Sequence, residues 1–134
     1  MKVEKGIATQ EVNEWLEFKR VSEKKKEARA EEIESIISEV EEGNLSVDDK
    51  FNLNYSLKFP IEDSEGNEMD QILSFKARLR SNELDPYLKG VKGADVDGRL
   101  RAYICALTGK NSQIIKKLDT EDHSICASIA LFFL

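Results

Sequence analysis

With 134 residues, the chain is long enough to bury one ordinary hydrophobic core without help from disulfides or metals. Its net charge of −6 argues against a protein that binds duplex nucleic acid, which would need a basic face. No stretch approaches the roughly 18 apolar residues of a membrane span, and the N-terminus has no apolar signal segment, so we expect a cytoplasmic protein. The cysteines, Cys105 and Cys126, lie within apolar helical patterns and are predicted to be reduced and buried.

The first 44 residues are predicted to form a long helix. Thr9 is expected to cap a helix that begins near Gln10, after a frayed tail. Residues 22–32 are almost entirely charged, but their high helix propensity and their i,i+3 and i,i+4 ion pairs favour continuation as a solvent-exposed rod. Residues 33–40 restore an apolar face before Gly43 ends the helix. Two interpretations are open: a surface helix docked at its two ends, or an arm for self-association or for a partner.

An alternating pattern across residues 51–61 is the clearest strand signal. One face of this strand is apolar: Phe51, Leu53, Tyr55, Leu57, Phe59 and Ile61. Pro60 lacks a backbone donor and favours a sheet edge or the end of the strand. After a turn at 62–67, residues 69–79 are predicted to return as a second strand, giving a β-hairpin over about 51–79. Its inward side chains would be Leu73, Phe75 and Ala77.

Short helices are predicted to follow the hairpin. Asp85 and Pro86 fit a helix start with proline at its first position. A longer helix has one apolar face, formed by Leu100, Tyr103, Ile104 and Leu107. Gly109 stands where the C-cap of this helix would be, and Asn111 can cap a short helical segment after it.

The last helix is expected to be capped by Thr120, with Glu121 and Asp122 at its positive N-terminal end. Its apolar face runs through Ile125, Ile129, Phe132 and Phe133. The predicted fold class is therefore α+β: a long N-terminal helix, a β-hairpin and a small C-terminal helical bundle.

No residue pattern points to catalysis or to a cofactor. Residues 95–98 faintly resemble a calcium loop, but Ile104 stands where the bidentate glutamate would be required. His123 has no further ligand or orienting group at a suitable spacing, so it is assigned to a helix face. Glycine-rich phosphate motifs and acid–base pairs are also missing from the sequence. We therefore predict an interaction or assembly module that is not an enzyme and needs no metal or cofactor.

Several short motifs occur together, in order, across residues 52–134: 55–62, 66–68, 72–75, 106–109, 114–118 and 118–122. In this order and spacing the chain resembles the tail assembly chaperones of long-tailed bacteriophages, in the version found in contractile-tailed phages. The resemblance divides the chain into an N-terminal extension, 1–44, and a chaperone-like α+β domain, 45–134. Residues 77–81 depart from the family, which has an Arg-Glu-Pro-like step there, and the extension is not part of the common pattern.

The resemblance implies a non-enzymatic assembly factor in the host cytoplasm, with no nucleic-acid or membrane partner. Such chaperones coat the tape measure protein and keep it soluble until tail tube subunits polymerise around it. In many members a programmed ribosomal frameshift gives a longer product, whose extra domain recruits the tail tube protein. The apolar ending of this chain would suit a uridine-rich slippery site in the gene. Homo-oligomerisation is left open.

A chaperone for a helical client needs an exposed apolar ridge or groove. The residues predicted to supply it are Leu131, Phe132, Phe133 and Leu134, with Trp15 and Leu16 second. The alternative for the terminal four is that they close the hydrophobic core.

Two other functions compete with the chaperone. The first is a structural baseplate or tail-associated component that stays in the virion. The second is a helical protein–protein adaptor in which residues 10–40 form a dimeric coiled coil, although the interruption of the apolar pattern weakens a continuous zipper.

Overall fold

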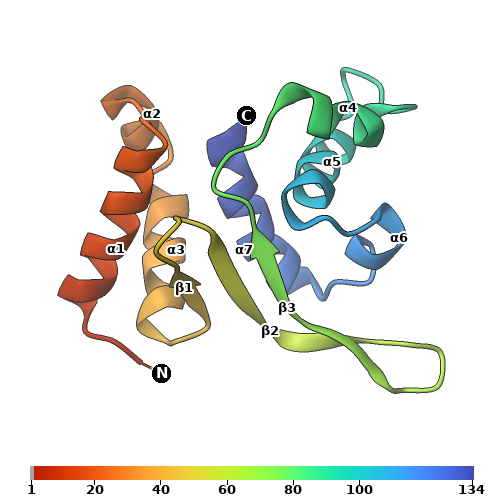
Figure 1. The fold of residues 1–134 in the computed structure, drawn as a ribbon, viewed down its shortest axis with the longest axis horizontal. Helices are drawn as coiled ribbons and strands as arrows, with labels where there is room; N and C mark the ends of the chain where they lie inside the picture. The colour runs from red at the N-terminus through yellow and green to blue at the C-terminus, as the bar shows by residue number, and fades with distance from the viewer. Residues whose placement is uncertain (1) are drawn as a thin grey trace.

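A computed structural model describes residues 2–134 and has an α+β fold, in which helices flank a small antiparallel sheet (Figure 1). Three helices and a short strand come first: α1 (Lys5–Phe18), α2 (Glu23–Ala28), α3 (Ala30–Glu41) and β1 (Leu45–Val47). The hairpin strands are β2 (Leu53–Glu62) and β3 (Glu68–Phe75). The remaining elements are α4 (Ser81–Leu88), α5 (Val96–Thr108), α6 (Ser112–Ile115), α7 (Thr120–Ala130) and the 3-10 turn η1 (Leu131–Phe133).

The N-terminal segment folds back on itself, so the prediction of one long helix is wrong. α1 ends at Phe18, and Arg20 adopts a left-handed conformation with φ of 57°. The Ser22 hydroxyl then accepts the Lys25 N–H at 3.1 Å and starts α2. α3 runs back along α1, as Figure 1 shows, and the Val3 N–H donates to the Glu41 carbonyl at 3.0 Å. The charged middle of the segment therefore forms a connection between two packed helices.

The start of α1 also differs from the prediction. The helix begins at Lys5, so Thr9 lies inside it and does not cap it. Ala8, expected in a frayed tail, is fully buried.

The sheet has the order β1-β2-β3 with antiparallel pairing throughout, and β1 is an additional strand that the sequence pattern did not predict. β2 and β3 form the predicted hairpin, which is regular from the pair Leu53 and Phe75 to the pair Ser56 and Ile72. Beyond that point the register shifts. The predicted inward residues of the second strand, Leu73, Phe75 and Ala77, are buried as expected.

The first hairpin strand agrees with its predicted pattern only in part. Leu53, Tyr55, Leu57 and Ile61 are buried. Phe51 is half-buried and precedes the strand, whereas the assignment of Phe59 to the inward face is wrong because its side chain is exposed.

Helix boundaries in the C-terminal part match the predictions closely, with two corrections. Gly109 ends α5 in a left-handed conformation, and Asn111 caps α6, both as predicted. α4 begins at Ser81, so Pro86 lies inside the helix and not at its start. The cap of α7 is Asp119, whose carboxylate accepts the Glu121 N–H at 3.0 Å, one residue before the predicted Thr120.

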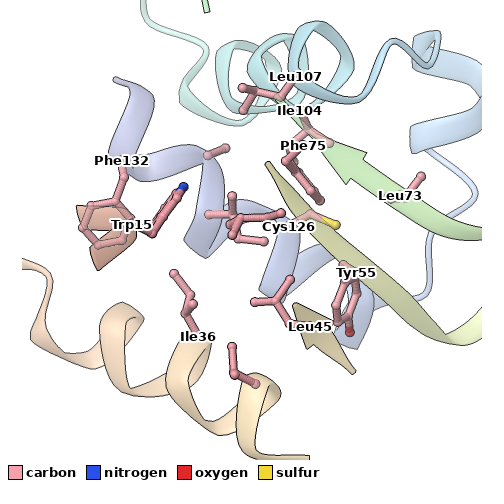
Figure 2. Close-up of a cluster of buried hydrophobic side chains, with 14 of the residues drawn as sticks. Trp15, Ile36, Leu45, Tyr55, Leu73, Phe75, Ile104, Leu107, Cys126 and Phe132 are labelled. Carbon is pink, nitrogen blue, oxygen red and sulfur yellow. The ribbon is translucent and has the colours of Figure 1, made fainter. Parts of the chain in front are cut away.

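A single buried cluster joins α1, α3, the sheet, α5 and α7 (Figure 2). Its largest fully buried side chains include Trp15, Tyr55 and Phe75, with residues from both sides of position 44 in the same cluster. Cys105 and Cys126 are free and buried, as predicted. Within residues 2–134, no helix is long and apolar enough to cross a membrane.

Candidate interaction surface

Three of the six residues predicted to bind a partner lie in the core. Trp15 and Leu16 are fully buried on α1, and Phe132 is buried on η1. The Phe132 ring meets the Trp15 indole edge-on, with ring centroids 5.7 Å apart (Figure 2). Such an aromatic pair contributes about 1 kcal/mol beyond the area it buries. In this fold these side chains stabilise the junction between the two ends of the chain.

The other three residues lie at the rim of that junction. Leu131 and Phe133 are half-buried, and Leu134 is 48% exposed. The Lys19 ammonium lies 3.2 Å from the Phe133 ring centroid, and the Lys25 ammonium donates to the Leu134 carbonyl at 3.0 Å. Burial lowers the pKa of Lys19 to about 8, and the charges of Arg78 and Lys25 act in the same direction. The role of all six residues in binding a partner stays a prediction.

Three exposed apolar side chains lie on the hairpin formed by β2, β3 and the turn between them, which we call the arm. Figure 1 shows the arm projecting beyond the helices. Phe59 is 51% exposed, Met69 47% and Ile72 57%. Exposed apolar side chains mark an interaction site where they form a contiguous patch.

The arm is held by a carboxylate on α7. Asp122 is fully buried, and its Oδ1 accepts the Tyr55 hydroxyl at 2.7 Å and the Lys58 N–H at 3.0 Å. Its Oδ2 accepts the N–H of the next residue, Phe59, at 2.9 Å. In a regular strand, successive N–H groups point to opposite sides. Here two of them meet one carboxylate, so Asp122 holds a β-bulge in β2.

The bulge explains why Phe59 breaks the alternation of its strand. Leu57 before it and Ile61 after it are buried, whereas Phe59 lies within the register shift between Ser56 and Ile61 and its side chain is exposed to solvent. Pro60 was the one signal in the sequence that the strand would be irregular here. Ile72 was also detectable, because it is an apolar residue on the predicted outward face of the second strand.

A second polar link joins the base of the arm to α3. Lys58 donates to Glu39 Oε2 at 3.1 Å, and the Asn44 side-chain amide donates to Glu39 Oε1 at 3.0 Å. Glu39 is buried, so both of its oxygens have partners where water is scarce. Glu39 thus fixes the base of the arm to α3, before position 44, and Asp122 fixes it to α7, after position 44.

Burial shifts the pKa of several titratable groups in and around the core. Burial raises the pKa of the Cys105 and Cys126 thiols, which keeps them protonated and weakly nucleophilic. Burial and the charge of Arg101 lower the pKa of His123. Among the described residues, no group of three His, Cys, Asp or Glu side chains is placed to hold a metal ion.

Comparison with known proteins returned no matching family model, no matching curated protein and no matching solved structure. The resemblance to tail assembly chaperones therefore rests on the motifs in the sequence alone.

Proposed function

We propose that this chain is a non-enzymatic tail assembly chaperone of a contractile-tailed phage. In the host cytoplasm it would bind the tape measure protein and keep it soluble until the tail tube polymerises. The observation that carries the proposal is the arm, which presents Phe59, Met69 and Ile72 to solvent while its base is fixed to α3 and α7.

The motifs behind the resemblance also meet in space. The strand motif at 55–62 is joined through Tyr55, Lys58 and Phe59 to Asp122 of the motif at 118–122. The residue that follows the motif at 72–75, Lys76, donates its N–H to the carbonyl of Leu107, which belongs to the motif at 106–109, at 3.1 Å. Motifs that are far apart in sequence thus stabilise one another.

The chemistry of the arm suits a long helical client. An amphipathic helix binds by laying its apolar stripe against exposed apolar side chains. Glu62, Glu65 and Glu68 are exposed around the tip of the arm and would favour basic residues beside that stripe. A contact limited to a few apolar residues is weak for each chaperone, so that many copies can coat the client and leave as the tube forms.

The proposal is tested by co-expressing the chain with the tape measure protein from the same genome. We expect a complex on pull-down and a larger soluble fraction of the client. If the two proteins do not associate and the solubility of the client is unchanged, the proposal fails.

A double variant, Phe59→Ser with Ile72→Ser, locates the binding surface. Both side chains are exposed, so the fold should persist by circular dichroism while the soluble client falls roughly tenfold. Val96→Ser is the matched control, because Val96 is an exposed apolar residue, 71% accessible, at the start of α5 and away from the arm. Equal loss of binding in the control would rule out the arm as the site.

Two further parts of the proposal have their own tests. A chaperone should be absent from purified virions by mass spectrometry, whereas a baseplate or tail component would be present. Recruitment of the tail tube protein is proposed to need a longer, frameshifted product. A gene that lacks both a slippery heptamer and an overlapping reading frame would remove that part.

A further inference from the structure

A pocket of about 400 Å³ lies between the end of α4, the middle of α5 and the start of α6. This volume is in the range of sites for small molecules. Its walls combine apolar and polar side chains, including Tyr87, Val91, Ala102, Cys105, Asn111 and Ser112. None of the residues on which the proposed chaperone function depends lines this pocket.

The charged side chains of the pocket are mostly positive, in a chain whose net charge is −6. Lys89, Arg101 and Lys116 line it, against one acid, Asp95. Asp95 Oδ1 already accepts the Gly98 N–H at 2.9 Å as the cap of α5. A negatively charged ligand would therefore meet a surplus of positive charge.

Arg101 is the most telling of these residues. Its Nε is buried and has no hydrogen-bond partner. Among the described residues, no carboxylate oxygen lies within 4.0 Å of its guanidinium group. A buried donor without a partner costs roughly 1–3 kcal/mol, so natural proteins retain few of them. An oxyanion beside the guanidinium group would offset part of this cost through its negative charge.

We propose that this pocket binds a small molecule that carries an oxyanion, a carboxylate or a phosphate, on a compact apolar body. The guanidinium fork of Arg101 matches the paired oxygens of either group. Asn111 Oδ1 accepts the Ile114 N–H at 3.0 Å, which leaves the side-chain amide nitrogen Nδ2 to donate to the ligand. Tyr87, Val91 and Ala102 offer the surface for the apolar body.

The test uses the full chain, labelled with ¹⁵N and titrated with phenyl phosphate, benzoate and inorganic phosphate. We expect saturable shifts of the Arg101 Nε–H signal and of backbone amides around the pocket. Phenyl phosphate should bind more tightly than inorganic phosphate, because only the former fills the apolar part. A preference between phenyl phosphate and benzoate identifies the oxyanion.

Matched variants on one helix separate a built site from general charge attraction. Arg101→Gln should weaken binding tenfold or more, since it removes a charged hydrogen-bond donor. Arg99→Gln removes the same charge from an exposed position of α5 that does not line the pocket, and should change binding less than twofold. If Arg101→Gln does not fold, Lys116→Gln takes its place, because Lys116 is exposed and lines the pocket.

Two results would overturn the proposal. One is the absence of saturable shifts with all three probes at millimolar concentration. The other is an equal loss of binding in the Arg101 and Arg99 variants, or in the Lys116 and Arg99 variants.

Discussion

Asp122 is a fully buried acid on α7 that joins this helix to β2. Its buried carboxylate accepts three hydrogen bonds from β2, which fixes the bulge and so the direction of Phe59. The same carboxylate raises the pKa of Tyr55, second to burial of the phenol, which keeps the hydroxyl protonated as a donor. One side chain on α7 thus determines which way the arm presents its apolar surface.

Replacing Asp122 by asparagine should destabilise the fold by about 3 kcal/mol. The substitution removes the charge and places an NH₂ group against backbone N–H donors, and breaking a buried network of this kind costs 3–5 kcal/mol when a partner is lost. Urea unfolding measures the change. Tyr55→Phe, which leaves both backbone bonds to Asp122 in place, should cost only about 1 kcal/mol.

Glu121→Gln is the control for this experiment, because Glu121 is its exposed neighbour on the same turn. It should change the stability by less than about 0.5 kcal/mol. A loss in Asp122→Asn no greater than in the control would contradict the role given to the bulge.

The sequence predicted where Asp122 lies but not what it does. An acid in the first turn of a helix is expected for the helix dipole alone, and Glu121 beside it meets that description. The difference between the two acids is burial by β2, some 60 residues away in the chain. The packing of α7 on the sheet buries Asp122 and leaves Glu121 exposed, and no local sequence pattern predicts that packing.

At the level of elements, strong periodicity was the best guide. The alternation over 51–61 and the helix face through Leu100 and Leu107 both correspond to observed elements, β2 and α5. β1 was missed because its three residues are too short to show a period, and it exists through pairing with β2. The break after α1 was missed because no glycine or proline marks it, and Ser22 was the only local signal.

That break gives a test at a single position, Arg20. Its left-handed conformation costs roughly 1 kcal/mol for a residue with a Cβ atom, and glycine avoids this cost. Arg20→Gly should therefore be more stable than Arg20→Ala by about 0.5–1 kcal/mol in urea unfolding. In a continuous helix the order reverses, because alanine is favoured over glycine by about 1 kcal/mol in a helix interior. If Arg20→Ala is the more stable variant, the result would contradict the break and support the single long helix predicted from the sequence.

At the level of the whole molecule, the two ends of the chain share one core. Trp15 of α1 packs on Phe132 of η1, and α3 packs on α7. The sequence showed an apolar stripe in each segment, but it did not show that the two stripes pack against each other. Three of the side chains expected to bind a partner, Trp15, Leu16 and Phe132, are thus buried inside the fold, and three of the exposed apolar residues lie on the arm.

A shared core should unfold as one unit, and Trp15 can report it because it is the only tryptophan in the chain. Unfolding followed by Trp15 fluorescence and by far-UV circular dichroism should give the same midpoint. Phe132→Ala should lower both midpoints together, with a loss of about 3 kcal/mol, since it opens a cavity beside Trp15. Leu134→Ala, two residues later and 48% exposed, is the control and should cost less than about 0.5 kcal/mol. A fluorescence midpoint that stays fixed while the circular dichroism midpoint falls would mean that the N-terminal helices unfold separately from the domain they cover.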